Sequence, residues 1–269
     1  MTVCNVKQIG CADVCPIPNT HGPIKRLFPV VFARQAPVQK SHVKRSLIFP
    51  AAVVFGILWV ATPIALHAQD QHAFKIARIK YGGGGDWYGD PESLKELLKF
   101  ANKESLLDIA PQEDVVELSS DKIYSYPYVY LTGHGNVKFS ETEGARLRRY
   151  LLNGGFLHID DNYGLDQHIR RELSIIFPDR ELRELPFDHP IFHTHYDFPA
   201  GLPKIHEHDG KRPQGFGLFD DDGRLMLFYT YECDLGDGWE PEEVHHDPPE
   251  KRLAALRMGT NILTYAMTN

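Results

Sequence analysis

The chain has 269 residues, of which 42% are apolar and 11% aromatic, and this composition excludes an intrinsically disordered protein. Its formal charge of −7 is unevenly distributed, because residues 1–68 hold seven basic residues and one acidic residue, whereas residues 69–269 hold 22 basic and 35 acidic residues and a net charge of −13. A domain with that charge repels phosphate backbones and anionic headgroups, so we expect no nucleic-acid partner and no membrane binding through the domain surface.

The first 42 residues show neither helical nor strand periodicity. Because an export signal normally begins at the N-terminus, residues 1–42 are either an unstructured leader or a stretch that is not translated, with the true start near Val43. Three of the four cysteines (Cys4, Cys11 and Cys15) lie in this stretch, at spacings that match no zinc motif. Cys233 is then alone in the domain, so we expect no disulfide within it.

Residues 43–68 have the order of an export signal, because Lys44 and Arg45 precede an uncharged apolar stretch over residues 47–66. A helix of that length spans about 30 Å, so the segment is either an N-terminal membrane anchor or a signal peptide cleaved after Ala68. We expect residues 69–269 to be exported across the cytoplasmic membrane, periplasmic or anchored facing outward. Residues 47–66 would make the only membrane contact, if the signal is not cleaved.

The first half of the domain alternates predicted strands and helices. In chain order these are a strand over residues 73–81, a helix over 91–101, strands over 115–118 and 128–132, and a helix over 145–153. Asp90 is the expected N-cap of the first helix, with Pro91 at its first position. A capping box of Ser140 and Glu143 precedes the second helix, which ends at Gly154.

The second half continues the alternation and ends in a hairpin and a helix. In chain order we predict a strand over residues 156–159, a helix over 165–177, a loop-rich stretch over 179–214, strands over 217–219 and 225–231, and a helix over 249–267. Parallel neighbours need a crossover, and helices supply it here. The sequence therefore predicts an α/β domain with a mainly parallel sheet covered on both faces and an antiparallel hairpin at its edge.

Glycine- and aspartate-rich turns follow four of the predicted strands, over residues 82–87, 133–136, 160–163 and 232–239. In open parallel sheets the ligand lies beyond the carboxyl ends of the strands, so we expect these turns to gather along one edge and bind a ligand. The proposed ligand-binding residues are Gly83, Gly84, Asp86, Trp87, His134, Asn136, Asp160, Asp161, Tyr163, Asp234 and Trp239. For Trp87, Tyr163 and Trp239 two roles are open, which are stacking on a sugar or peptide and packing.

The glycines of residues 82–85 could cradle an anion, but Asp86 and Asp90 oppose a phosphate and no nucleotide-binding spacing is present, so we expect them to let the backbone turn sharply. Asp160 and Asp161 are adjacent and point to opposite faces of a strand. We expect one to face the crevice, while the other, or Asn162, caps the following helix.

Eleven of the 14 histidines follow residue 69, without a recognised metal-binding spacing. They are expected to be scattered surface residues, or alternatively to supply ligands for a divalent metal, and we expect no other cofactor. Histidines that could ligate a metal are His189, His193, His195, His206, His208, His245 and His246. The candidate metal ligands are His134, Asp160, His189 and Asp234, and the candidate catalytic residues are His134, Asp160 and Asp161. Cys233 is expected to be a buried, inert thiol.

Several motifs in order, GGGGDWY, GHGNVKF, GGFLHIDDNYG, DHPIFHTHYDF, ECDLGDGWE and RMGTNILTYAM, resemble the family called domain of unknown function 4159. The resemblance implies the fold of class I glutamine amidotransferases, a flavodoxin-like three-layer α/β sandwich. It also implies cell-envelope proteins, often encoded near MoxR-type ATPases and von Willebrand factor A proteins. The nucleophilic cysteine of amidotransferases corresponds here to Asp160 or Asp161, so glutamine hydrolysis is not expected.

The sequence therefore indicates an exported, non-catalytic binding or assembly module of the envelope that lacks the cysteine nucleophile. Its expected partners are envelope proteins or a small polar ligand. The alternative is a metal-dependent hydrolase with an aspartate and histidine site at the carboxyl ends of the strands.

Overall fold

The computed structural model describes residue 72 and residues 74–269, which belong to a compact unit, Ile64–Asn269. The predicted leader, signal or anchor segment and start near Val43 lie outside the described residues. Within residues 74–269, no helix is long and apolar enough to cross a membrane.

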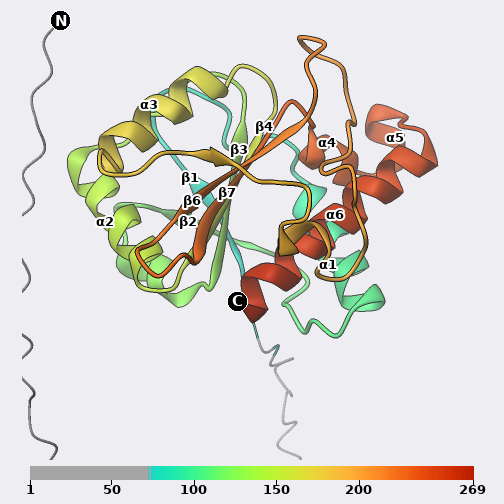
Figure 1. Ribbon diagram of the computed structural model, residues 1–269, viewed down its shortest axis with the longest axis horizontal. Coiled ribbons are helices and arrows are strands. Elements are labelled where there is room, and N and C mark those ends of the chain that lie inside the picture. The colour runs from blue at the N-terminus through green and yellow to red at the C-terminus, as the bar shows by residue number, and fades with distance from the viewer. Residues whose placement is uncertain (1–71, 73) are drawn as a thin grey trace, which may run out of the picture. The chain divides into compact units, whose positions relative to one another are not determined.

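In the described part of the chain, seven strands form one sheet in the order β2-β1-β3-β4-β7-β6-β5 (Figure 1). The strands are β1 (Ala77–Lys80), β2 (Asp114–Glu117), β3 (Tyr128–Gly133), β4 (Phe156–Asp161), β5 (Arg183–Glu184), β6 (Gln214–Phe219) and β7 (Leu225–Tyr231). The pairs from β2 through β7 are parallel, and β6 and β5 are antiparallel to their neighbours. The predicted α/β fold with an antiparallel edge is confirmed.

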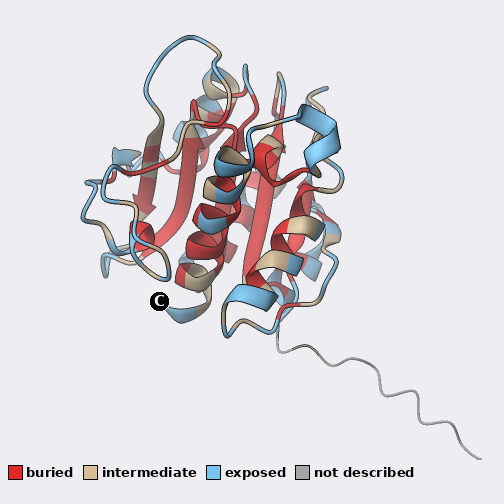
Figure 2. Ribbon diagram, turned by 90° about the vertical axis from the view of Figure 1, so that its right-hand side faces the viewer, coloured by how far each residue is buried: buried red, intermediate tan, exposed pale blue. Residues whose placement is uncertain are grey.

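Helices cover both faces of this sheet (Figure 1). They are α1 (Ser93–Glu104), α2 (Glu141–Leu152), α3 (Asp166–Ile176), α4 (Leu235–Trp239), α5 (Glu242–His245) and α6 (Pro249–Thr268), with short 3-10 helices η1 (Asp121–Ser125) and η2 (Pro190–Phe192). Alternate residues of the central strands enter two cores, one with α1, α4 and α6 and the other with α2 and α3. Figure 2 shows the resulting buried strands between partly exposed helices.

The two predicted helix starts have different outcomes. The capping box of Ser140 and Glu143 is present at α2, as expected. The prediction that Asp90 caps α1 is wrong, because the helix begins at Ser93 and Asp90 has a left-handed backbone with φ of 51°. The distant Glu240 accepts instead from the amides of Glu92 and Ser93, at 2.9 and 3.1 Å.

His158 is a polar residue in the middle of β4 and is completely buried. Its ring nitrogens lie 3.0 Å from the Tyr128 hydroxyl and 3.1 Å from the Thr230 hydroxyl. Burial lowers the pKa of His158 from 6.5 to about 3, because the charged imidazolium would lose its hydration. The folded protein therefore keeps this imidazole neutral.

Because His158 is buried in its neutral form, we expect the protein to lose stability in acid. Between pH 6.5 and about 3 the unfolded chain binds a proton at His158 that the folded chain does not, so its stability contribution is complete above pH 6.5 and falls as the pH falls. From pH 6 to pH 4 the free energy of unfolding is expected to fall by about 2 kcal/mol more in the wild type than in His158→Gln. Urea unfolding across this range measures the difference, and equal slopes for the two proteins would contradict the prediction.

Candidate functional site

The four glycine- and aspartate-rich turns lie along one edge of the sheet, at the carboxyl ends of β1, β3, β4 and β7, as predicted. The Gly85 amide donates to the Asn136 carbonyl at 2.9 Å, which joins the first turn to the second. The Asn162 amide group donates to Asp90 at 2.5 Å and to Asp237 at 3.2 Å, which joins the third turn to the segment after the first turn and to the fourth turn. We call this border the carboxyl edge.

One half of the carboxyl edge is built of backbone packed on backbone. Gly83 has a φ of 109°, and a Cβ atom there would lie 2.8 Å from the Asn136 carbonyl oxygen. Asp86 accepts from the backbone amide of His134 and lies 3.1 Å from its Nδ1 atom. Gly83 therefore allows a sharp turn and close packing, the structural role expected for this glycine-rich loop.

Asp160 and Asp161 point to opposite faces of β4, as expected. Asp161 accepts from the backbone amides of Tyr163 and Leu165, at 3.1 and 2.9 Å, and so fixes the turn into α3. Asp160 faces α4 and accepts from the Gly236 amide at 2.6 Å and from the Thr230 hydroxyl. Burial raises the pKa of Asp160 to about 7 and that of Asp161 to about 6. Both carboxyl groups are enclosed by protein.

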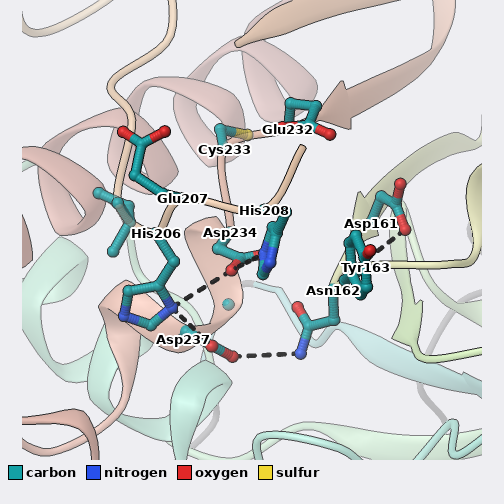
Figure 3. Close-up of polar contacts among 12 residues, drawn as sticks. Asp161, Asn162, Tyr163, His206, Glu207, His208, Glu232, Cys233, Asp234 and Asp237 are labelled. Atoms are coloured by element: carbon teal, nitrogen blue, oxygen red, sulfur yellow. Dashed lines mark hydrogen bonds and ion pairs between the residues drawn. The ribbon is translucent and has the colours of Figure 1, made fainter. Parts of the chain in front are cut away.

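The other half of the carboxyl edge holds a cluster of ionisable side chains from three chain segments, of which Figure 3 labels His206, His208, Asp234 and Asp237. We call it the histidine–aspartate cluster, which consists of His206, His208, Asp234, Asp237, His245 and Asp247. The His206 Nδ1 atom lies 3.2 Å from Asp234 and 2.9 Å from Asp237, and its Nε2 atom lies 3.1 Å from Asp247. Hydrogen bonds with Asp234 and Asp237 raise the pKa of His206 to about 10.

Tertiary packing also positions a further aspartate, Asp90, beside this cluster. Asp90 sits under the first turn of α1, where Arg78, which is itself buried, donates to its carbonyl oxygen at 3.0 Å. Burial, and then repulsion from Asp237, raise the pKa of Asp90 to about 8. Perturbed carboxyl groups concentrated in one place are typical of functional sites.

Strained backbone is also concentrated here. Within residues 74–269, the non-glycine residues with positive φ are Asp90, Tyr163, Glu232, Asp234 and His246. Tyr163, Glu232 and Asp234 belong to the turns of the carboxyl edge, Asp90 is hydrogen-bonded to Asn162 of the third turn, and His246 lies between His245 and Asp247 of the cluster. A left-handed non-glycine residue costs on the order of 1 kcal/mol, and such residues cluster at active sites and ligand clamps.

The predicted aromatic ligand contacts differ in accessibility. Trp239 is fully buried between α6 and the sheet, and its indole nitrogen donates to the Ala255 carbonyl at 2.8 Å. The stacking role considered for Trp239 is therefore wrong, and packing is its role. Tyr163 is half exposed, and its ring stacks on that of His208 with centroids 4.7 Å apart. Trp87 is partly buried and lies under Lys80.

The four predicted metal ligands do not come together. Asp234 belongs to the histidine–aspartate cluster and Asp160 lies beside it, while His134 pairs with Asp86 in the glycine-rich half. His189 lies at the opposite end of the sheet, because its ring contacts Phe219 at the end of antiparallel β6 and Tyr265 near the start of β4. Remoteness in space therefore excludes a joint site for these four residues.

The sequence named His206, His208 and His245 as possible metal ligands, but none of them, nor Asp237 or Asp247, was placed in the predicted site. His206 and His208 come from the loop-rich stretch before β6, Asp237 from α4, His245 from α5 and Asp247 from the turn after it. Among the described residues, His206, Asp237 and His245 form a group whose potential ligand atoms all lie within 4.8 Å of one another. The sequence signals were the spacing of Asp234 and Asp237 after a strand and the His-x-His pair of His206 and His208.

The model of one protein family, described as Domain of unknown function (DUF4159), matches residues 75–267. No curated protein matches the chain. The matched range includes every residue of the carboxyl edge described above.

Proposed function

The chain belongs to the DUF4159 family, and from this premise we propose that its domain binds a small polar ligand at the carboxyl edge of the sheet. The observation that carries the proposal is the concentration of left-handed non-glycine residues at this border, together with buried carboxyl groups. Strained backbone and buried carboxyl groups both destabilise a fold, and proteins normally keep them where a ligand is bound.

Charge favours a particular class of ligand. The carboxyl groups of Asp234, Asp237 and Asp247 all contact the imidazole of His206, and the domain as a whole is strongly acidic. An anionic ligand would be repelled, whereas a neutral or cationic polar molecule would be attracted. We therefore propose amino sugars, short peptides or amines as the ligand class, and an exported domain that meets them in the cell envelope.

We also propose a likeness to the class I glutamine amidotransferase fold without amidotransferase chemistry. Cys233 is fully buried, and burial raises the pKa of its thiol well above the usual range, so the nucleophilic thiolate would not form. Asp160 occupies the end of the central strand β4, where a carboxylate cannot form a thioester with glutamine.

Thermal unfolding of the full-length protein with N-acetylglucosamine, D-alanyl-D-alanine, lysine and inorganic phosphate tests the ligand proposal. A true ligand at 100 times its dissociation constant adds about 2.7 kcal/mol, which raises the unfolding midpoint by about 5–10 °C. Tyr163→Asn removes the half-exposed tyrosine ring that stacks on His208, and is expected to abolish the rise. The control Tyr124→Ala lies in η1, before the start of β3, and is expected to preserve it. A rise with phosphate alone, or a panel that leaves the midpoint unchanged, would contradict the proposal.

A second candidate function is a metal-dependent hydrolase, which the group of His206, Asp237 and His245 favours. Three protein ligands that leave a coordination position open are typical of catalytic zinc sites. Hydrolysis of chromogenic ester, phosphate and peptide substrates that requires added zinc and disappears in Asp237→Asn would select this candidate over simple binding.

A further inference from the structure

Three potential metal ligands converge in the histidine–aspartate cluster. The Nδ1 atom of His206 lies 2.9 Å from one carboxylate oxygen of Asp237, and the Nε2 atom of His245 lies 3.8 Å from the other. Ligand atoms about 2.0–2.1 Å from a tetrahedral zinc ion are separated by about 3.4 Å. The two distances bracket this value, so small side-chain rotations would bring all three groups onto one ion.

The groups behind these ligands are arranged as they are around metal ions in proteins. The other ring nitrogen of His206, Nε2, faces the Asp247 carboxylate at 3.1 Å, a contact that fixes the ring orientation. The Asn162 amide group donates to Asp237 at 3.2 Å and orients this carboxylate as well. Outer partners of this kind hold ligands in place before the ion arrives.

Asp234 provides an independent observation. Its side chain is 1% exposed and its Oδ2 atom contacts both His206 and His208, but its Oδ1 atom has no hydrogen-bond partner among the described residues. A buried carboxylate oxygen without a partner is costly, and a nearby cation would remove the cost.

We propose that His206, Asp237 and His245 bind one divalent transition-metal ion of the zinc class, with Asp234 beside it. Two imidazoles and a carboxylate suit zinc, whereas magnesium and calcium prefer sites made of oxygen atoms alone. The inference goes beyond the proposed organic ligand and does not depend on it. It assigns a joint role to His206, from the loop before β6, and to Asp237 and His245, from the segment after β7.

An ion-pair network without a metal is the competing explanation, because His206 already contacts the carboxyl groups of Asp234, Asp237 and Asp247. The two explanations differ in their response to zinc. If only ion pairs form, zinc binds weakly, and its affinity does not depend on His245, which approaches Asp237 no closer than 3.8 Å. If the site binds metal, loss of His245 removes a ligand while leaving the fold intact, since its side chain is on the surface.

The experiment is a calorimetric titration of the full-length protein with zinc chloride. To remove other thiolate ligands, all proteins carry serine at the three leader cysteines, Cys4, Cys11 and Cys15. We expect one zinc ion per chain, at least about 100-fold weaker affinity in His245→Ala and Asp237→Asn, and 10–100-fold weaker affinity in Asp247→Asn. The matched control is His246→Asn, because this neighbouring exposed residue lies outside the ligand group and asparagine tolerates its φ of 56°.

Unfolding midpoints without zinc show whether each variant folds, and His245→Ala is expected to match the parent protein. Equal zinc affinity in the parent and His245→Ala, or no stoichiometric binding in a folded parent, would overturn the site. Tighter binding of magnesium or calcium than of zinc would overturn the proposed metal class.

Discussion

Replacement of Trp239 by alanine is expected to lower the free energy of unfolding by about 3–5 kcal/mol. Trp239 is fully buried in α4, its ring lies 5.5 Å from that of Tyr130 and 5.8 Å from that of His158, and its nitrogen donates to the Ala255 carbonyl. The substitution leaves a large cavity and an unpartnered carbonyl group. Urea unfolding measures the loss.

The control is Tyr88→Ala, which also removes an aromatic ring from the carboxyl edge. Tyr88 is 63% exposed, so its replacement is expected to change the free energy of unfolding by no more than about 0.5 kcal/mol. Comparable losses in the two variants would show that Trp239 is not the packing residue that its burial indicates.

Replacement of Gly133 by alanine is expected to lower the free energy of unfolding by about 2–4 kcal/mol. Gly133 ends β3 with a φ of 134°, which disfavours any side chain. A Cβ atom would also collide with the Tyr81 hydroxyl and lie 2.8 Å from the Asp86 carbonyl oxygen. The collision would separate the first and second turns of the carboxyl edge.

Gly135→Ala is the matched control for that collision. Gly135 also has a positive φ, of 78°, but no atom lies within 4 Å of the position that a Cβ would take. Only backbone strain remains, so the expected loss is about 1 kcal/mol. Equal losses at the two glycines in urea unfolding would mean that the turns are not packed as closely as described.

The sequence predicted those parts of the fold that depend on neighbouring residues. The capping box at Ser140 and Glu143 is complete within one helical turn, and the hairpin of β6 and β7 surrounds a local turn, so both patterns are visible along the chain. The start of α1 was predicted wrongly because its capping group, Glu240, lies 147 residues from Ser93. No local pattern could have revealed that partner.

The candidate site was also predictable only in part. The positions of the four turns were predictable, because the carboxyl ends of parallel strands share one edge of a sheet. The membership of the histidine–aspartate cluster was not, since His206 reaches Asp234 and Asp247 only after a loop folds back over the end of β7. The packing role of Trp239 was not predictable either, because a glycine-rich turn has no hydrophobic periodicity from which the burial of its tryptophan could be inferred.

The most direct test of the account is a crystal structure of the protein grown with zinc and measured at the zinc absorption edge. The account predicts one strong anomalous peak per chain, within about 2.0–2.2 Å of one nitrogen each of His206 and His245 and of an oxygen of Asp237. A peak held by other residues, or a cluster in which His206 still bridges Asp237 and Asp247 with no peak between them, would contradict it.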